Sequence, residues 1–177
     1  MEKKNILITG PPRVGKTTLV KKILELIPEI RAKGFLSQET KEGGERVGFS
    51  LITLDGREGV LAHINLKTGP RVARYRVNIK DIEEIAAPSI SPEEGIELIV
   101  IDEIARMECF SPAFRSEVIR ALDSEIPVLA TIQISRHPFL NWVRGRDDVT
   151  IYKIDLENRE ELVFSISKRL KKFIGKI

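Results

Sequence analysis

Short runs of apolar residues alternate along the chain with segments whose apolar positions recur at helical spacing. The continuous runs predict buried strands, and the amphipathic segments between them predict helices. Such an alternation is typical of a parallel sheet covered by helices on both faces. Ser111 and Pro112 have the residue types of an N-cap and a first helical position. Strands are expected at residues 5–9, 98–101, 127–132 and 149–154, and helices at residues 16–27, 112–124, 138–144 and 158–173.

The segment 34–79 has a different pattern. Its β-type residues are interrupted by Gly43-Gly44 and Asp55-Gly56, which are both hairpin signals. The segment therefore predicts an antiparallel ribbon inserted after the first helix. A loop is expected before the strand at 98, at Pro88, Ser89, Ser91 and Pro92.

The first strand leads directly into GPPRVGKTT, residues 10–18. Gly10, Gly15, Lys16 and Thr17 fill the fixed positions of the pattern G-x-x-x-x-G-K-[ST], and a strand before and a helix after are the context that the pattern requires. Backbone amides at the start of a helix point at an anion, and the helix dipole favours it. Lys16 adds a cation for the outer phosphates, and the Thr17 hydroxyl is a ligand for Mg²⁺. The segment predicts a phosphate-binding loop.

Pro11 and Pro12 lack a backbone N–H, but the amides that surround the phosphates lie mostly at residues 13–18. The prolines therefore stiffen the entry to the loop without removing important donors. Arg13 is either an extra cation folded over the phosphates or a side chain that points outward. The outward orientation is favoured, because Lys16 already serves the outer phosphates.

The second half of the expected site is ELIVIDEIARME, in which Asp102 and Glu103 end an apolar strand. A carboxylate at this place is the usual Mg²⁺-holding partner of a phosphate-binding loop, so Asp102 takes that role. Glu103 is expected to orient or deprotonate the attacking water, which favours hydrolysis over binding alone. The catalytic candidates are Lys16 and Glu103, and the metal ligands are Thr17 and Asp102. The expected nucleotide contacts are Gly10, Pro11, Pro12, Arg13, Val14, Gly15, Lys16, Thr17, Thr18, Asp102 and Glu103.

The composition narrows the protein class. The chain has 177 residues, of which 42% are hydrophobic and 31% charged, and this predicts one globular domain spanning residues 1–177. Its net charge of +3 does not by itself predict nucleic-acid binding. The apolar runs are too short for a membrane helix or a signal peptide. A single cysteine, Cys109, allows no internal disulfide, which suits a cytoplasmic protein.

Several segments together give a specific resemblance. The chain resembles the nucleoside-triphosphatase family first described from thermophiles, which has a cancer-related human member. The segments that carry the resemblance are, in order, the loop, GFLSQET, GGERVGFSLITLDGREGVLAH, YRVNIKDIEEIAAPSI, VIDEIARME and VRGRDDVTIYKIDLENR. The resemblance implies a P-loop NTPase fold, an α/β three-layer sandwich in which another strand separates the first strand from the Asp102 strand. It also implies slow, Mg²⁺-dependent hydrolysis of several nucleoside triphosphates.

The chain departs from the family pattern at two places. Arg13 stands where the family usually has glycine, and Ala105-Arg106 stands where it has Gly-Lys. If that glycine serves a left-handed backbone, Arg13 must adopt it at a cost of roughly 1–2 kcal/mol. Arg106 keeps the charge of the lysine but presents a planar fork. These changes affect the expected rate and nucleotide preference, not the reaction class.

For the weaker candidate site residues, the sequence leaves two interpretations open in each case. Arg144 and Arg146 suit internal arginine fingers and solvated loop charges equally well. Asn158 suits either a nucleobase contact or, as favoured here, a capping box with Glu161. Thr131 and Gln133 suit γ-phosphate sensing or ordinary polarity at a strand end.

Other polar and aromatic residues have simpler expectations. His63 and His137 form no metal-binding pattern with the one cysteine, so no zinc is expected. Trp142 and the phenylalanines are expected in the core. A basic tail either touches nucleic acid or, as favoured, faces water beside a helix C-terminus; it comprises Lys168, Arg169, Lys171, Lys172 and Lys176.

The sequence therefore predicts a Mg²⁺-dependent nucleoside triphosphatase with broad base tolerance that acts as a monomer on ATP, GTP and related substrates. Three alternatives remain open. These are a kinase whose ribbon at 34–79 shapes an acceptor pocket, an ATPase stimulated by nucleic acid through the basic tail, and a binding module switched by its nucleotide.

Overall fold

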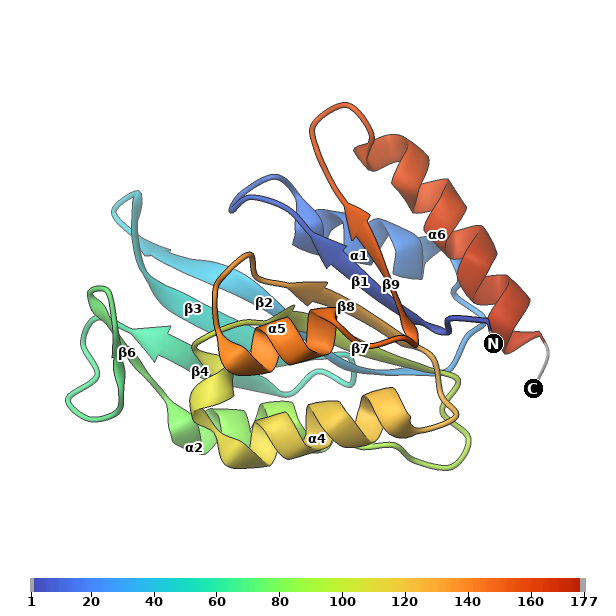
Figure 1. The fold of residues 1–177 in the computed structure, drawn as a ribbon. Coiled ribbons are helices and arrows are strands. Elements are labelled where there is room, and N and C mark those ends of the chain that lie inside the picture. Colours follow the sequence, from blue (N-terminus) through green and yellow to red (C-terminus); the bar gives the residue numbers. More distant parts are fainter. Residues whose placement is uncertain (1, 176–177) are drawn as a thin grey trace.

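The computed structural model describes residues 2–175, and these form a nine-stranded sheet with helices on both faces (Figure 1). The strand order is β5-β6-β4-β3-β2-β7-β8-β1-β9. The strands are β1 (Asn5–Thr9), β2 (Ala32–Glu42), β3 (Glu45–Thr53), β4 (Glu58–His63), β5 (Arg71–Val72), β6 (Tyr75–Val77), β7 (Leu98–Ile104), β8 (Val128–Ile132) and β9 (Val149–Lys153). The main helices are α1 (Lys16–Leu26), α4 (Pro112–Asp123), α5 (Pro138–Arg144) and α6 (Arg159–Ile174), and the shorter ones are α2 (Ile79–Asp81), η1 (Ile82–Ala86), α3 (Ala87–Ser89) and η2 (Glu108–Phe110).

One half of the sheet is parallel. Strand β8 pairs in parallel with both β1 and β7, and β9 pairs in parallel with β1. The strand that carries Asp102 is thus separated from β1 by one strand, as expected. Because parallel strands point the same way, the carboxyl ends of β1, β7 and β8 meet at one edge of the sheet.

The other half is antiparallel and continues the same sheet. Strands β2, β3, β4, β6 and β5 pair in antiparallel order, and β2 pairs in parallel with β7 from Ala32 to Phe35. The predicted ribbon is therefore an extension of the central sheet that begins at β2. The hairpin signals are confirmed, since Gly43, Gly44 and Gly56 adopt positive φ angles at the turns that flank β3.

The helices divide into two layers (Figure 1). Helices α1 and α6 pack against each other on one face, over a core that includes Ile6, Ile23 and Leu170. Helices α4 and α5, with the short helices η1 and α3, cover the other face around Phe35, Phe114 and Leu140. Each buried strand thus contributes to both layers, which explains its continuous apolar run.

The expected loop before β7 begins later than predicted. Pro88 and Ser89 are helical, because α2, η1 and α3 follow one another without interruption from residue 79 to residue 89. Pro88 is the second residue of α3, just after the chain passes from η1 into α3. Ser91 and Pro92 remain in the loop.

The aromatic residues are not all core residues. Phe35 and Phe114 are buried in edge contact, with ring centroids 6.1 Å apart. The expectation is wrong for Trp142, whose exposure is 44%, and for Phe110 and Phe164, which are also exposed. Trp142 lies on the outer side of α5, where its ring stacks on Phe139 and the Arg146 guanidinium covers it.

Candidate active site

The loop between β1 and α1 lies at the edge where the carboxyl ends of the parallel strands meet. Gly10 is enclosed, since a Cβ atom there would lie 2.8 Å from Cγ2 of Ile154 and 3.0 Å from Cγ1 of Val14. Gly15 has a φ of 106°, a conformation that L side chains rarely adopt, and it is the N-cap of α1. Both glycines are therefore required by the path of the loop, which leads the chain directly into the first turn of α1.

Arg13 also has a left-handed backbone, with a φ of 63°. The left-handed backbone, which was expected on the condition that the family's usual glycine serves one, is therefore present at this position. Its side chain is 67% exposed, and its Nε donates a hydrogen bond to Oε1 of Glu39 on β2 over 3.3 Å. Pro11 and Pro12 are exposed, and the carbonyl of Pro11 accepts a hydrogen bond from the amide of Val14. The arginine thus points away from the loop toward an acidic neighbour.

Lys16 is the first residue of α1, and its side chain returns across the loop. Its Nζ donates to the carbonyl oxygen of Gly10 over 2.9 Å and lies 3.9 Å from Oε1 of Glu103. The ammonium group is therefore held between the loop and the carboxyl end of β7. This position suits a cation that contacts the outer phosphates of a nucleotide.

Asp102 is 1% exposed and accepts hydrogen bonds from three groups. The hydroxyl of Thr17 donates to its Oδ2 over 2.8 Å, the hydroxyl of Thr131 to its Oδ1 over 2.6 Å, and the amide of Ser37 to its Oδ2 over 3.3 Å. Burial raises the pKa of this carboxyl, and the hydrogen bonds and the charge of Lys16 act against that rise. Thr131, one of the weaker candidates, thus contacts the aspartate directly, and Ser37 was not anticipated.

Glu103 follows at the same end of β7. Burial raises the pKa of its carboxyl to about 6, while the charge of Lys16 lowers it. The group is consequently a carboxylate near neutral pH, with a proton affinity well matched to taking a proton from water. The peptide bond that joins it to Asp102 is cis.

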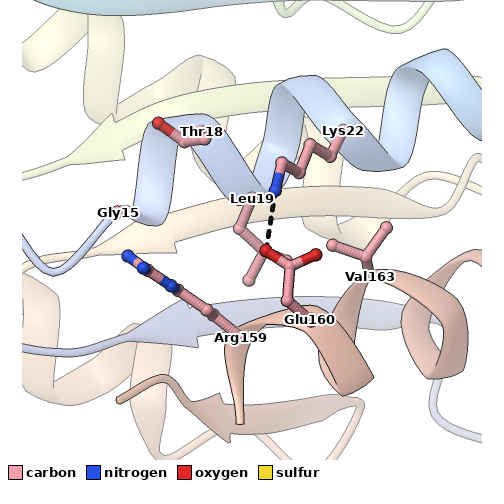
Figure 2. Close-up of a pocket in the computed structure, with 7 residues that line it drawn as sticks. All are labelled: Gly15, Thr18, Leu19, Lys22, Arg159, Glu160 and Val163. Atoms are coloured by element: carbon pink, nitrogen blue, oxygen red, sulfur yellow. Dashed lines mark hydrogen bonds and ion pairs between the residues drawn. The ribbon is translucent and has the colours of Figure 1, made fainter. Parts of the chain in front are cut away.

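A pocket of about 200 Å³ adjoins the loop on the α6 side (Figure 2). Gly15, Thr18 and Lys22 line it from the loop and α1, and Arg159 and Glu160 line it from α6. Figure 2 shows the Arg159 guanidinium directed toward Gly15, with the carboxylate of Glu160 paired to Lys22 at 2.7 Å. Arg159 was not anticipated from the sequence, although its place at the start of the helix that follows β9, the strand beside β1, could have indicated it.

Two of the proposed arginine fingers have other partners. Arg146 pairs with Asp123 and with Asp148, whose carboxylate contacts Asn5 at the start of β1. That end of the strand is opposite to the loop, so Arg146 is not a finger. Arg144 donates to the carbonyl oxygens of Gln133 and Ser135 and fixes the segment after β8.

Gln133 and Asn158 also form local structure. The side chain of Gln133 accepts a hydrogen bond from the amide of Arg106, which ties β8 to the turn after β7. The predicted capping box at Asn158 is wrong. Its Oδ1 accepts from the amide of Asp155, and its Nδ2 donates to the carbonyl of Lys153, so the side chain closes the loop before α6 and leaves the helix uncapped.

Most cations of the basic tail contact the protein itself. Arg169 donates to the carbonyl of Lys3 and the hydroxyl of Thr150, Lys171 pairs with Glu29, and Lys172 pairs with Glu2. Lys168 is exposed, and Lys176 lies outside the described residues. The histidines serve turns: His63 accepts from the amide of Asn65, and His137 is the N-cap of α5.

Comparison with known proteins agrees with this geometry. The chain matches the family described as "NTPase" over residues 5–167. It is 46% identical to "Nucleoside-triphosphatase THEP1" of Thermotoga sp. (strain RQ2) over 94% of this chain and 95% of that protein. The chain belongs to the NTPase family. It is accordingly a nucleoside-triphosphatase, a hydrolase that acts on nucleoside triphosphates.

Further relatives of this NTPase include "Cancer-related nucleoside-triphosphatase" of Homo sapiens, which is 34% identical over 90% of this chain and 93% of the human protein. The crystal structure of THEP1 from Aquifex aeolicus superposes with a TM-score of 0.85 at 35% identity, covering 94% of this chain and 99% of that chain. The solution structure of the human protein gives a TM-score of 0.81 at 33% identity, covering 96% of this chain and 98% of that chain. Among the described residues, no helix of this NTPase has the length and apolar character to cross a membrane.

Proposed function

We propose that this NTPase hydrolyses ATP, GTP and other nucleoside 5′-triphosphates to the diphosphate and phosphate in a Mg²⁺-dependent reaction with broad base tolerance. The observation that carries the proposal is the contact between Thr17 and Asp102, two residues far apart in the sequence whose oxygens lie 2.8 Å apart. It joins the phosphate-binding loop to the acidic end of β7, which together make up a hydrolytic P-loop site.

The residues around Asp102 fit a magnesium ion. The carboxylate is buried, yet its three hydrogen-bond donors are all uncharged, and a buried carboxylate without a charged partner is costly. Hydroxyl and carboxylate oxygens are the ligands that Mg²⁺ prefers. Thr17 and Asp102 would hold the ion, and it would neutralise charge on the β- and γ-phosphates. Thr131 and Ser37 orient the carboxylate for this role.

Lys16 and Glu103 have complementary roles in the proposed reaction. The oxygen of a water molecule forms a bond to the γ-phosphorus, the bond from that phosphorus to the β–γ bridging oxygen breaks, and the diphosphate leaves with the electron pair. Glu103 accepts the proton of the water, for which its raised pKa is suited. Lys16 neutralises charge on the outer phosphates from its position between Gly10 and Glu103.

The pocket beside the loop supports base tolerance. Its polar side chains are the hydroxyl of Thr18, the guanidinium of Arg159 and the paired Lys22 and Glu160. A guanidinium plane stacks on any nucleobase, whereas base selection requires polar groups aimed at one pattern of base edges. We infer that the nucleobase lies in this pocket against Arg159. We also propose that the enzyme is a monomer and acts in the cytoplasm.

The test is phosphate release by the purified enzyme with ATP, GTP, CTP and UTP, with Mg²⁺ and after chelation of the metal. We expect many turnovers with each nucleotide, equal amounts of phosphate and diphosphate, and loss of activity on chelation. Transfer of the γ-phosphate mainly to an added nucleoside or to a DNA 5′ end would identify a kinase and overturn the proposal.

A further inference from the structure

One face of the antiparallel half of the sheet is not covered by a helix. The helices that pack on β3 and β4 are α2 and η1, and they lie on the side of the core formed around Leu51, Leu61 and Ile82. In the described part of the chain, an open groove of about 670 Å³ is lined by residues of β2, β3 and β4 and, at its margin, by Asp81 of α2. Its lining includes the uncharged residues Gln38, Thr40, Ser50 and Val60, one lysine, Lys41, and the carboxylates of Glu39, Glu58 and Asp81.

A long stretch without acidic residues forms the outer edge of this half. Between Glu58 and Asp81 the chain contains five lysines and arginines and no aspartate or glutamate. The stretch forms most of β4 and all of β5 and β6, and β5 is the edge strand of the sheet. Positive charge that is concentrated in one part of a protein can attract a polyanion there, even though the net charge of the chain is only +3.

The strand register places part of this charge on the open face. Thr40 is opposite Gly48, Gly48 is opposite His63, His63 is opposite Arg76, and Arg76 is opposite Arg71. Residues that are directly opposite in a sheet share a face, and Thr40 shares its face with Gln38 of the groove. These residues therefore form a transverse row across five strands, roughly 19 Å long at the usual strand spacing.

The pair Arg71 and Arg76 is unusual because like charges directly opposite each other destabilise a sheet. Among the described residues, neither side chain has a carboxylate partner; Arg76 donates only to the carbonyl of Gly69. By contrast, Arg46 pairs with Glu39 and donates to Tyr75. The β5–β6 end of the transverse row thus carries two arginines that have no carboxylate partner among the described residues.

We propose that this face binds a single-stranded nucleic acid through its phosphates. The strand would contact Arg71 and Arg76 and extend across the row toward the phosphate-binding loop. The length of the row favours a strand over a single nucleotide. The row contains no exposed aromatic side chain on which bases would stack, so binding is independent of sequence and strongly dependent on salt. The site differs from the basic tail, whose cations Arg169, Lys171 and Lys172 contact the protein.

The test is the fluorescence anisotropy of a labelled oligothymidylate titrated with the nucleotide-free protein, which makes the result independent of the proposed hydrolysis. The double variant Arg71→Ala/Arg76→Ala is compared with Lys171→Ala/Lys172→Ala, which removes the same charge from α6. We expect the first variant to bind at least about tenfold more weakly and to reduce the salt slope of log K by about 1.4, at about 0.7 for each lost phosphate contact. The α6 variant should bind like wild type.

Further variants and a second ligand distinguish the possible results of this titration. Arg71→Lys/Arg76→Lys should retain binding, because phosphate contacts need the charge more than the fork. If the alanine pair does not fold, Arg71→Ala alone serves, since Arg71 is exposed. Absence of binding by wild type, equal losses in the two double variants, or a loss confined to the α6 variant would each overturn the proposal. If AMP binds as tightly as the oligonucleotide, the face binds single nucleotides, and the proposal of a nucleic-acid strand is overturned.

Discussion

Nε of Arg13 lies 3.3 Å from Oε1 of Glu39, and this contact joins the phosphate-binding loop to strand β2. Glu39 is held in turn by Arg46, which donates to the same oxygen over 2.9 Å. The hydrogen bond from Arg46, with a smaller contribution from Arg13, lowers the pKa of the Glu39 carboxyl. The acidic neighbour of Arg13 is therefore a carboxylate at neutral pH, and the guanidinium has a partner outside the phosphate site.

Arg13→Gly should consequently leave turnover within a few-fold of wild type. The glycine relaxes a left-handed backbone that costs an arginine roughly 1–2 kcal/mol, and the lost ion pair is exposed and contributes little. Arg13→Ala is the matched control, because it removes the guanidinium and keeps the strained backbone. Steady-state hydrolysis of ATP and GTP is the measurement. A loss of about 10³-fold in kcat with binding retained would identify Arg13 as an arginine finger.

Lys16→Ala should abolish turnover, because the outer phosphates lose the cation that the structure holds between Gly10 and Glu103. Lys21→Ala is the control, since Lys21 lies exposed on the same helix and away from the loop. Phosphate release at saturating ATP and Mg²⁺ distinguishes the two variants. Activity of Lys16→Ala within about threefold of wild type would refute the assignment of the loop, because removal of a phosphate cation normally costs far more.

Glu103→Gln should retain binding of nucleotide and Mg²⁺ while hydrolysis falls by about 10²-fold or more, the range of general-base effects. The substitution preserves the shape of the side chain but removes its capacity to accept a proton. Binding is followed with a fluorescent nucleotide, and hydrolysis by phosphate release. Normal hydrolysis with impaired binding would show that Glu103 is structural and that water is activated elsewhere.

The half of the site that depends on local sequence was predictable. The β1–loop–α1 unit and the strand that ends at Asp102 each have a short, continuous pattern, and the parallel sheet brings their ends together. These features need only the residues themselves and the direction of parallel strands. The left-handed backbone at Arg13 was a conditional expectation, which rested on the glycine that the family usually has at that position.

The features that were missed depend on distant pairing. Ser37 reaches Asp102 because β2 pairs in parallel with β7, a register that no pattern within either strand specifies. The partner of Arg13 was hidden for the same reason. Asn158 was assigned to a helix cap from a spacing of three residues, but the loop before α6 uses the same amide to close on Lys153. The spacing of residues alone does not distinguish a helix cap from a loop-closing hydrogen bond, because the choice depends on where the loop places the backbone groups around the Asn158 side chain.

Glu108 offers a test of the site's electrostatic environment, because it is buried and its Oε2 has no hydrogen-bond partner. Burial raises the pKa of this carboxyl well above its usual range, and the nearby charge of Glu103 adds to the rise. The folded state thus binds a proton that the unfolded state releases near pH 4.5. The stability associated with this proton is complete below that pH and declines as the pH rises toward the folded pKa.

Glu108→Gln removes the titration and should therefore stabilise the protein increasingly as the pH rises. The gain should be small near pH 4.5 and grow by up to about 1.4 kcal/mol for each pH unit above it until the folded pKa is reached. Urea denaturation of both proteins across this range gives the difference in unfolding free energy, from which the other titrating groups cancel. Glu84→Gln, at an exposed position in η1, is the control and should give a difference close to zero at every pH. A difference for Glu108→Gln that does not vary with pH would mean that the buried carboxyl does not gain a proton on folding.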